Sequence, residues 1–471
     1  MSRRARPRVA GTLLARYAVT LPLVVAVVLG GVSGCFSRPL PTESIPIPTR
    51  PTPAPAPAVD TVEAIPTDAP PPGPSIGVGP PVRVALRVAL DTAALTATGP
   101  WRLLDARGGV LVRSRANERW HLERRAARTR AVREDGAATP WTNGTVYQFP
   151  DDAGTVRSAG KNYRGAIGFV ATDTGILVVN HLPLEDYLRG VVPLEIGDRG
   201  PGERAAVEAQ AVAARSFTVI RLLNSKSGVG RSPDFDLISS VGDQVYGGQS
   251  AERPVADEAV RVTSGLVLMM GGRVVNAPFF SACGGETAAA EEVWRTDGEP
   301  HLRRVSDKIP GTDRHYCDIA PRFAWTRSFS GAELDAAVRK YLASVAEVGR
   351  SGPGQVTDLH IERRTPSGRV GQLIVRTSRG SYIVRGNDAR SVLRTPSGEL
   401  LNSSYFSVSI ERSGDKLMRA VLRGNGYGHG VGMCQWGAIG RARAGQDLRS
   451  ILRTYYPGTT LTQLPPSLLS Q

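Results

Sequence analysis

The stretch NHLPLEDYLRGVVPLEIGDRGPGERAAVEAQAVAARSFTVIRLLN, residues 180–224, decides the expected architecture of the chain. Its first part repeats apolar residues at three- and four-residue spacing, which predicts a helix with one buried face. Because Pro193 disfavours helical geometry at Val192, Glu195 is expected in a loop or a short new turn. Residues 203–223 lack Gly and Pro and are rich in alanine, which predicts a long, closely packed helix.

Gln210 and Arg215 stand among alanines on this second predicted helix. A buried polar side chain needs hydrogen-bonding partners. The pair therefore fits either a structural network beneath the helix or a ligand-contacting surface, and spacing alone does not decide between them.

Two further motifs carry side chains suited to recognition. GNGYGHGVGMCQWGA, residues 424–438, combines glycines, which permit close backbone approach, with Tyr, His, Gln and Trp, which stack on and hydrogen-bond to sugars. FFSACGGET, residues 279–287, places a small-residue turn after a predicted strand. A phosphate-binding loop does not fit the first motif in its context. A purely structural glycine loop remains an alternative.

The leader is read from residues 1–34, where five arginines and no acids precede the apolar run 21–30. The run ends in Val32-Ser33-Gly34-Cys35, which predicts a lipoprotein signal peptide with Cys35 as the lipidated first residue of the mature chain. An ordinary signal peptide with an incidental cysteine is the alternative. Removing the five arginines from a net charge of +15 leaves +10.

The remaining chain is expected to be one large α+β domain or two tightly joined ones. Residues 35–80 are proline-rich and predict an extended stalk with a reach on the order of 100 Å. Residues 81–160 form a β-rich region packed against the helical and mixed-sheet core of residues 161–460, and residues 461–471 form a tail. Further helices are expected at 253–263, 331–348 and 448–455, with a hairpin turn at Gly271-Gly272.

PLEDYLRGVVPLEI followed by EAQAVAARSF resembles the core signature of the stage II sporulation protein D family, also called the amidase-enhancer family. The two motifs at 279–287 and 424–438 follow in that family's order, and the resemblance covers roughly residues 160–460. It implies a peptidoglycan lytic transglycosylase that cuts between N-acetylmuramic acid and N-acetylglucosamine, prefers strands without stem peptides and leaves 1,6-anhydro-muramic ends. By the same resemblance, Glu195 acts as general acid and then as base.

The residues around Glu195 suit that role. A general acid that works near neutral pH needs an apolar pocket to raise its pKa, and its neighbours are apolar. Hydrolysing glycosidases use two carboxylates. A lytic transglycosylase manages with one, and Glu185, Asp186 and Asp198 stay open as a second. A helix-start acid favoured by the helix dipole is the alternative for Glu195.

The resemblance also nominates Arg215, Ser281, His429 and Gln435 as substrate-groove residues. A non-catalytic peptidoglycan-binding enhancer of a cell-wall amidase is the rival function, and an envelope tether that uses only the lipid and the stalk is a third. The leader and stalk predict a lipid-anchored envelope protein of a diderm bacterium that faces the periplasm. The basic surplus is expected to meet anionic glycan or membrane surface rather than nucleic acid.

With Cys35 assigned to the lipid, three cysteines remain. In an oxidising compartment Cys283 and Cys317 would most simply form a disulfide and leave Cys434 free. Some members of the stage II sporulation protein D family bind zinc near the active site through Cys and His. In this chain the candidate ligands for such a site are His301, His315, Cys283 and Cys317. Their spacing matches no compact zinc motif, so no metal or other cofactor is expected, and zinc stays an alternative.

Overall fold

The structure, a computed structural model, describes residues 79–468 except 90, 117, 152–153 and 229–231. The predicted leader, Cys35 and nearly all of the predicted stalk lie outside the described residues. The chain divides into Met1–Ala69 and Pro70–Gln471, and the described residues all belong to the second unit. Within the described ranges, no helix has both the length and the apolar character needed to cross a bilayer.

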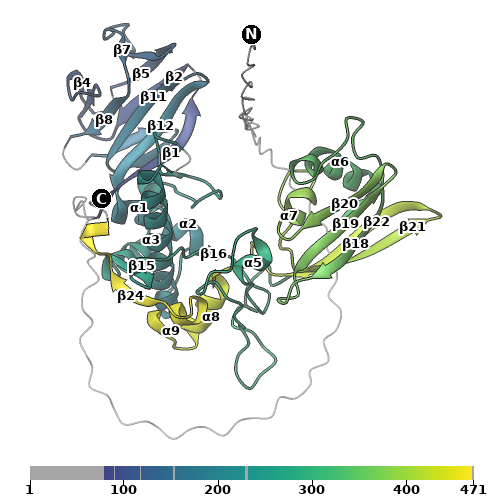
Figure 1. Cartoon of the computed structure of the whole chain (residues 1–471). Helices are drawn as coiled ribbons and strands as arrows, with labels where there is room; N and C mark the ends of the chain where they lie inside the picture. Colours follow the sequence, from purple (N-terminus) through teal and green to yellow (C-terminus); the bar gives the residue numbers. More distant parts are fainter. Residues whose placement is uncertain (1–78, 90, 117, 152–153, 229–231, 469–471) are drawn as a thin grey trace, which may run out of the picture. The chain divides into compact units, whose positions relative to one another are not determined.

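A seven-stranded sheet forms much of the β-rich N-terminal region (Figure 1). Its strands in spatial order are β13 (Leu237–Ile238), β1 (Pro81–Ala89), β12 (Gly175–Pro183), β11 (Ala166–Thr172), β8 (Val146–Pro150), β3 (Trp101–Leu104) and β4 (Val110–Ser114). Along β12, Ile176 and Val178 enter the main core, whereas Leu177 and Val179 enter a small separate cluster. Successive strand residues point to opposite faces, so β12 is buried on both sides.

A second sheet of six strands completes this region. Its order is β10 (Lys161–Tyr163), β9 (Val156–Ser158), β2 (Thr92–Ala97), β5 (Trp120–Arg125), β6 (Arg128–Arg133) and β7 (Thr142–Asn143). Apolar residues of both sheets and of the following helices belong to one continuous core. The β-rich region therefore packs on the helical part and does not stand apart from it.

The helical part begins directly after β12 with α1 (Leu184–Arg189) and α2 (Val192–Ile196). A Cβ atom at Gly190, between them, would lie 2.6 Å from the Tyr246 ring, so the close approach of this ring requires glycine. The prediction that Val192 leaves helical geometry is wrong, because Val192 starts α2 and Pro193 occupies the first turn, where its missing N–H costs nothing. Glu195 lies on this short helix, as the expected new turn implies.

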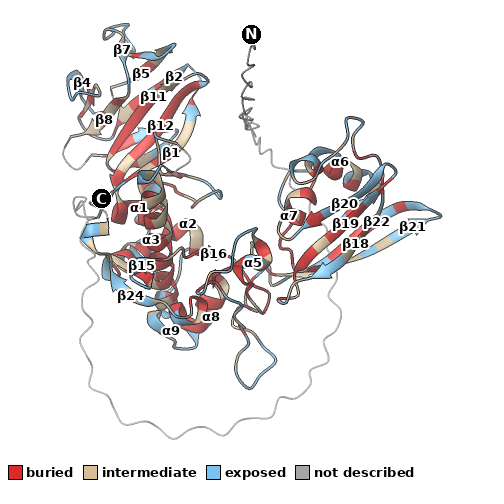
Figure 2. Cartoon of the chain, viewed as in Figure 1, coloured by how far each residue is buried: buried red, intermediate tan, exposed pale blue. Residues whose placement is uncertain are grey.

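Helix α3 (Arg204–Lys226) follows the 3₁₀ turn η1 (Pro201–Glu203) and confirms the long alanine-rich helix. Its small residues are buried along most of its length, and Figure 2 shows it coloured as buried. Besides α1 and α2, it contacts α4 (Pro254–Val262), α8 (Gln435–Arg443) and α9 (Leu448–Tyr455). Both α4 and α9 fall where the sequence predicts them.

A three-stranded sheet lies against α3. Its hairpin, β14 (Leu266–Met270) and β15 (Arg273–Val274), turns at Gly271 and Gly272, both with positive φ as expected. Its third strand, β24 (Thr460–Gln463), pairs with β14. The predicted boundary of the tail is therefore wrong, because residues 461–463 belong to this sheet.

Residues 324–425 carry a hydrophobic core of their own. It lies among two three-stranded sheets and two helices: β17 (Ala324–Ser330), β22 (Lys416–Asn425) and β21 (Phe406–Ser413); β18 (Val356–Arg364), β19 (Val370–Thr377) and β20 (Gly380–Arg385); α6 (Gly331–Tyr341) and α7 (Asp388–Val392). The helix predicted to reach residue 348 ends at Tyr341 and continues only as the 3₁₀ turn η3 (Leu342–Ser344). This second core lies within the single domain expected over residues 161–460, whose sequence pattern does not reveal it.

The last elements are short. The parallel pair β16 (Phe279–Phe280) and β23 (Met433–Cys434) joins the two predicted recognition motifs. The others are η2 (Gln249–Ala251), α5 (Ala290–Val293) and η4 (Pro466–Leu468). Helices and sheets without regular β-α-β alternation confirm the α+β class.

Candidate active site

Glu195 is half-buried on α2, between buried Val192 and Ile196 and beside Leu194, which is 45% exposed. Val245 N donates a hydrogen bond of 2.7 Å to Glu195 Oε1. Burial raises the pKa of the Glu195 carboxyl above its ordinary value of 4.5, while the Val245 N–H and the Gln435 side chain act to lower it. The geometry is that of an acid that keeps its proton at higher pH than an exposed glutamate and still reaches the surface.

The Val245 N–H is held in place by its neighbour Gln244, whose side chain is fully buried. Tyr187 on α1 and Thr218 on α3 each donate a hydroxyl hydrogen bond of 3.0 Å to Gln244 Oε1. The loop that carries Val245 is therefore tied to two helices. The sequence does not predict this contact, because a backbone donor leaves no residue-type signature.

Gln435 brings the glycine-rich motif to Glu195. It is the first residue of α8, is 7% exposed, and its Nε2 donates to Gln210 Oε1 on α3 at 3.2 Å. Gln210 Nε2 is buried without a hydrogen-bond partner among the described residues. Gln210, singled out in the sequence only as a polar residue needing partners, thus belongs to the surroundings of the acid.

Ser281 also lies at this junction. It is half-buried directly after β16, and its carbonyl accepts a hydrogen bond of 3.0 Å from Trp436 N. The half-buried Trp436 ring has the Arg199 guanidinium 4.8 Å from its centroid, and Arg199 follows α2 by three residues. Gln435, Trp436, Ser281 and Arg199 therefore gather around the end of the glycine-rich motif.

Arg215 does not belong to this group. Its side chain has no exposed surface and forms a two-pronged ion pair with Glu185, at 2.8 Å from Nε to Oε1 and 2.7 Å from Nη2 to Oε2. A third donor, Nη1, reaches Leu266 O at 3.1 Å. The prediction that Arg215 contacts substrate is corrected, because the guanidinium donors of Arg215 are used by partners inside the protein. Arg215 therefore belongs to a structural network, the alternative that spacing alone left open.

His429 is corrected in the same way. Val431 N donates to its Nδ1 at 3.1 Å, and Nε2 therefore carries the proton and donates to Phe279 O at 3.0 Å. The ring packs between Phe280 and Trp294, with both centroid distances at 5.2 Å. Burial, with Arg390 and Arg369 nearby, lowers the pKa of His429 to about 4. The imidazole is neutral with both nitrogens used, so it supports the loop and offers no free polar atom to a sugar.

The alternative second carboxylates are placed differently from Glu195. Glu185 and Asp186 are buried on α1, where Arg215 and Arg189 respectively pair with them. Asp198 is exposed. In the described part of the chain, no carboxylate is among the groups that shift the pKa of Glu195. The site is arranged around one acid.

The cysteines depart from the expected disulfide. Sγ of Cys283 and Sγ of Cys317 lie 3.2 Å apart, well beyond an S–S bond of ~2.05 Å, and Cys434 joins them instead of standing alone. His301 and His315, the histidines of the alternative zinc set, are not in this group: His301 Nε2 bonds to Asn276 O and the His315 ring packs on Phe323. The fourth member is Asp307, which the sequence analysis did not single out.

A wide surface hollow lies elsewhere, lined by residues that include Trp294, Arg295 and Asp388. None of the predicted site residues lines it. Size alone marks this hollow, whereas Glu195 combines partial burial, a raised pKa and specific hydrogen bonds. Perturbed titration is the stronger indicator of chemistry, so the candidate site is placed at Glu195.

The segment that carries Glu195 matches a known protein family. Residues 172–270, which include α1, α2 and α3, match the family model described as stage II sporulation protein, and residues 311–432 match a domain of unknown function, DUF8618. The chain is similar to stage II sporulation protein D of Bacillus subtilis (strain 168), 31% identical over 60% of this chain and 76% of the relative. The chain belongs to the stage II sporulation protein D family, which confirms the resemblance seen in the sequence.

Two other relatives extend this comparison. An uncharacterized protein of Brachyspira hyodysenteriae is 31% identical over 64% of this chain and 73% of its own length. The amidase enhancer of Bacillus subtilis (strain 168) is 32% identical over 58% of this chain, and the matched part is only 40% of that relative.

Proposed function

We propose that this protein is a lytic transglycosylase of peptidoglycan glycan strands, with Glu195 as its single acid and base. The observation that carries the proposal is the state of Glu195: a half-buried carboxyl with a raised pKa, one backbone donor and a neighbouring glutamine. The family shared with stage II sporulation protein D and the amidase enhancer supports a role in the cell wall.

The proposed reaction uses Glu195 twice. Its protonated carboxyl first donates a proton to the glycosidic oxygen, and the bond from that oxygen to the anomeric carbon of N-acetylmuramic acid breaks. The carboxylate then takes the proton from the C6 hydroxyl of the same sugar, whose oxygen closes the 1,6-anhydro ring. The acid ends as it began, so no water enters the products and no second carboxylate is required.

The surroundings of Glu195 fit both halves of this cycle. Burial favours the protonated form needed first, whereas the Val245 N–H and Gln435 stabilise the carboxylate formed in between. Trp436 offers a half-buried ring on which a sugar face could stack, and Ser281 lies beside it. Gln435 and Ser281 stay as proposed substrate contacts.

The cellular setting is part of the proposal. Lipidation at Cys35 and the proline-rich residues 35–80 would tether the protein to a membrane of the envelope and let the domain reach glycan strands in the periplasm. A cell-wall amidase that removes stem peptides would supply denuded strands. The membrane follows from the predicted leader and stalk, and the amidase is suggested by the similarity to an amidase enhancer.

The test is product analysis on purified sacculi, both intact and stripped of stem peptides by an amidase. The full chain is expected to release saccharides with 1,6-anhydro ends, identified by mass spectrometry, and Glu195→Gln is expected to abolish release while leaving pelleting with sacculi unchanged. Asp198→Asn is the matched control, because it removes an exposed carboxylate three residues away.

Three other results would contradict the proposal. Products with reducing ends instead of anhydro ends, lost in Asp198→Asn, would indicate a hydrolase with two carboxylates. Binding to sacculi without any product would favour the second candidate, a non-catalytic enhancer of an amidase, which the similarity to the amidase enhancer supports. Full activity of Glu195→Gln would remove this residue from the chemistry.

A further inference from the structure

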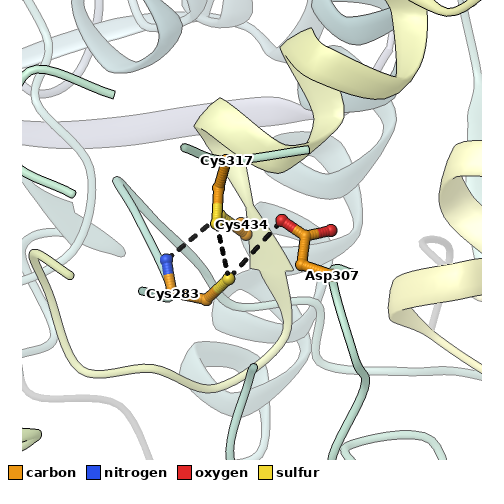
Figure 3. A group of neighbouring side chains, drawn as sticks. All are labelled: Cys283, Asp307, Cys317 and Cys434. Atoms are coloured by element: carbon orange, nitrogen blue, oxygen red, sulfur yellow. Dashed lines mark hydrogen bonds between the residues drawn. The ribbon is translucent and has the colours of Figure 1, made fainter. Parts of the chain in front are cut away.

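Three of the four cysteines in the sequence meet in one buried cluster with an aspartate (Figure 3). The cluster consists of Cys283, Asp307, Cys317 and Cys434, and all four residues are buried. Cys283 follows β16, Cys434 ends β23 and is the N-cap of α8, and Asp307 and Cys317 lie in the segment that joins α5 to β17. The four side chains converge from three separate parts of the chain.

The ligand atoms have the spacing of a tetrahedral metal site. One Sγ from each cysteine and one carboxylate oxygen all lie within 4.8 Å of one another. Cys283 Sγ is 3.2 Å from Cys317 Sγ and 3.5 Å from Asp307 Oδ2. Zinc–sulfur bonds of ~2.3 Å in a tetrahedron place neighbouring sulfurs roughly 3.8 Å apart, so small side-chain shifts would accommodate an ion.

The carboxylate is held in the way that metal-bound carboxylates are. Asp307 Oδ1 accepts hydrogen bonds from Tyr455 OH at 2.7 Å and Arg441 Nη2 at 3.0 Å, which leaves Oδ2 toward the thiols. Outer hydrogen bonds of this kind fix the orientation of a ligand. The Arg441 charge would also offset part of the negative charge that three thiolates and a carboxylate bring to a divalent ion.

The cysteine sulfurs have the backbone support expected of a thiolate. Cys283 N and Gly437 N donate to Cys434 Sγ at 3.1 and 3.2 Å. Cys434 caps the N-terminus of α8, where the helix dipole favours an anion. Simple packing of cysteines as small apolar residues would not require these donors or a buried carboxylate beside them.

We propose that Cys283, Asp307, Cys317 and Cys434 form a structural site for one Zn²⁺ ion. The three thiols give up their protons to solvent on binding, the ion takes three sulfurs and Asp307 Oδ2, and no oxidant or reductant is involved. Four protein ligands close the site, so the ion would hold segments of this one chain together rather than activate water. This inference does not depend on the proposed transglycosylase activity.

The metal site would fix the position of Gln435, whose side chain lies beside the Glu195 carboxyl. Cys434 is a ligand and Gln435 is its immediate neighbour, so the ion would join β16, the Asp307–Cys317 segment and the start of α8. A zinc ion at this junction would keep Gln435 in place beside the acid. Stability and metal content report on the site whether or not the protein is an enzyme.

The experiment measures the metal in the purified full chain. After exposure to Zn²⁺ and extensive dialysis, elemental analysis is expected to find one zinc ion per chain. Removal by a chelator under denaturing conditions should release it and expose three thiols to a thiol reagent. Replacement by Co²⁺ is expected to give the visible absorption of tetrahedral cobalt with thiolate ligands, and melting temperature should fall when the metal is removed.

Variants make the assignment specific. Asp307→Asn and Cys434→Ser are expected to lower zinc affinity by at least ~10-fold, and Tyr455→Phe, which removes an outer hydrogen bond, by about 10-fold. The matched control is Asp313→Asn in the same segment, whose carboxylate is exposed and pairs only with Lys308 at 3.1 Å among the described residues. It should keep one zinc ion per chain.

Several results would overturn the proposal. A wild-type chain without zinc after this treatment, with three free thiols, would show a plain buried cluster. An intact mass lacking two hydrogens would show a disulfide instead. Zinc retained by Asp307→Asn and Cys434→Ser alike would place the ion elsewhere. If these variants do not fold, the zinc content, thiol count and cobalt spectrum of the wild-type chain decide the question alone.

Discussion

Arg215→Met is expected to cost stability without touching the chemistry of the site. Arg215 is fully buried on α3, and its guanidinium forms the two-pronged pair with Glu185 and a hydrogen bond to Leu266 O. Methionine keeps most of the volume and helix propensity of the side chain but removes the charge. The change therefore leaves Glu185 in the core without its partner.

The structure sets the magnitude. Removing one partner of a buried, hydrogen-bonded ion pair costs about 3–5 kcal/mol, because the other charge stays desolvated. That is a large part of the ~5–15 kcal/mol that stabilises a typical domain. Changing both partners, Arg215→Met with Glu185→Leu, removes both buried charges and should recover most of the loss. Arg204→Met, at an exposed pair with Glu208 on the same helix, should cost about 0.5 kcal/mol or less.

The assay is urea unfolding of the wild type and the three variants, followed by glycan binding and product release under conditions in which each is folded. If Arg215 is structural, Arg215→Met loses stability, the double variant regains it, and both bind sacculi like the wild type while folded. A stable Arg215→Met that fails to bind glycan strands would refute the reasoning and restore Arg215 as a groove residue.

Three further outcomes follow from the site. Because burial raises the pKa of Glu195 in the folded chain, the folded state binds the proton of this carboxyl more tightly than the unfolded state does, and it loses stability as pH rises above 4.5. Glu195→Gln should therefore be more stable than the wild type at neutral pH, and the melting curves of the two proteins should converge at acidic pH. Gln435→Ala removes a group that lowers the pKa of Glu195, so the basic limb of the pH–activity profile should move to higher pH. The pKa of His429 is lowered to about 4, so the neutral imidazole contributes fully to stability above pH 6.5 and contributes less as pH falls toward 4. The free energy of unfolding should be lower by about 2 kcal/mol at pH 5 for this reason, and His429→Gln should flatten that decline in urea unfolding at pH 7 and 5.

Local signals in the sequence predicted local structure well. The alanine-rich run without Gly or Pro gave α3, the glycine pair gave the β14–β15 turn, and Pro193 marked the short helix that carries Glu195. These features depend on residues near one another in the chain, for which propensity and turn chemistry decide the conformation. The assignment of Val192 was wrong because a proline is also accepted in the first turn of a new helix.

Long-range contacts were the part that the sequence could not supply. Cys283 and Cys434 are 151 residues apart, and nothing in their spacing indicates that they meet at a buried aspartate. The glycine-rich motif contained the right residue types, but composition could not tell that His429 uses both nitrogens on the backbone while Gln435 faces α3. Roles within a motif depend on which direction each side chain takes.

Glu195 receives its two supports from parts of the chain that lie far apart in the sequence. Val245 N reaches Glu195 from a loop tied to α1 and α3, whereas Gln435 reaches it from a helix that starts at the cysteine cluster. A Cβ atom at Gly432 would lie 2.0 Å from Pro278 O, so the chain just before Gln435 can approach β16 only as glycine. The glycine-dense loop therefore serves less to touch a sugar through each of its polar residues than to deliver Gln435 to the carboxyl, and substitutions at Gly432 should alter the pH dependence of Glu195 through that displacement.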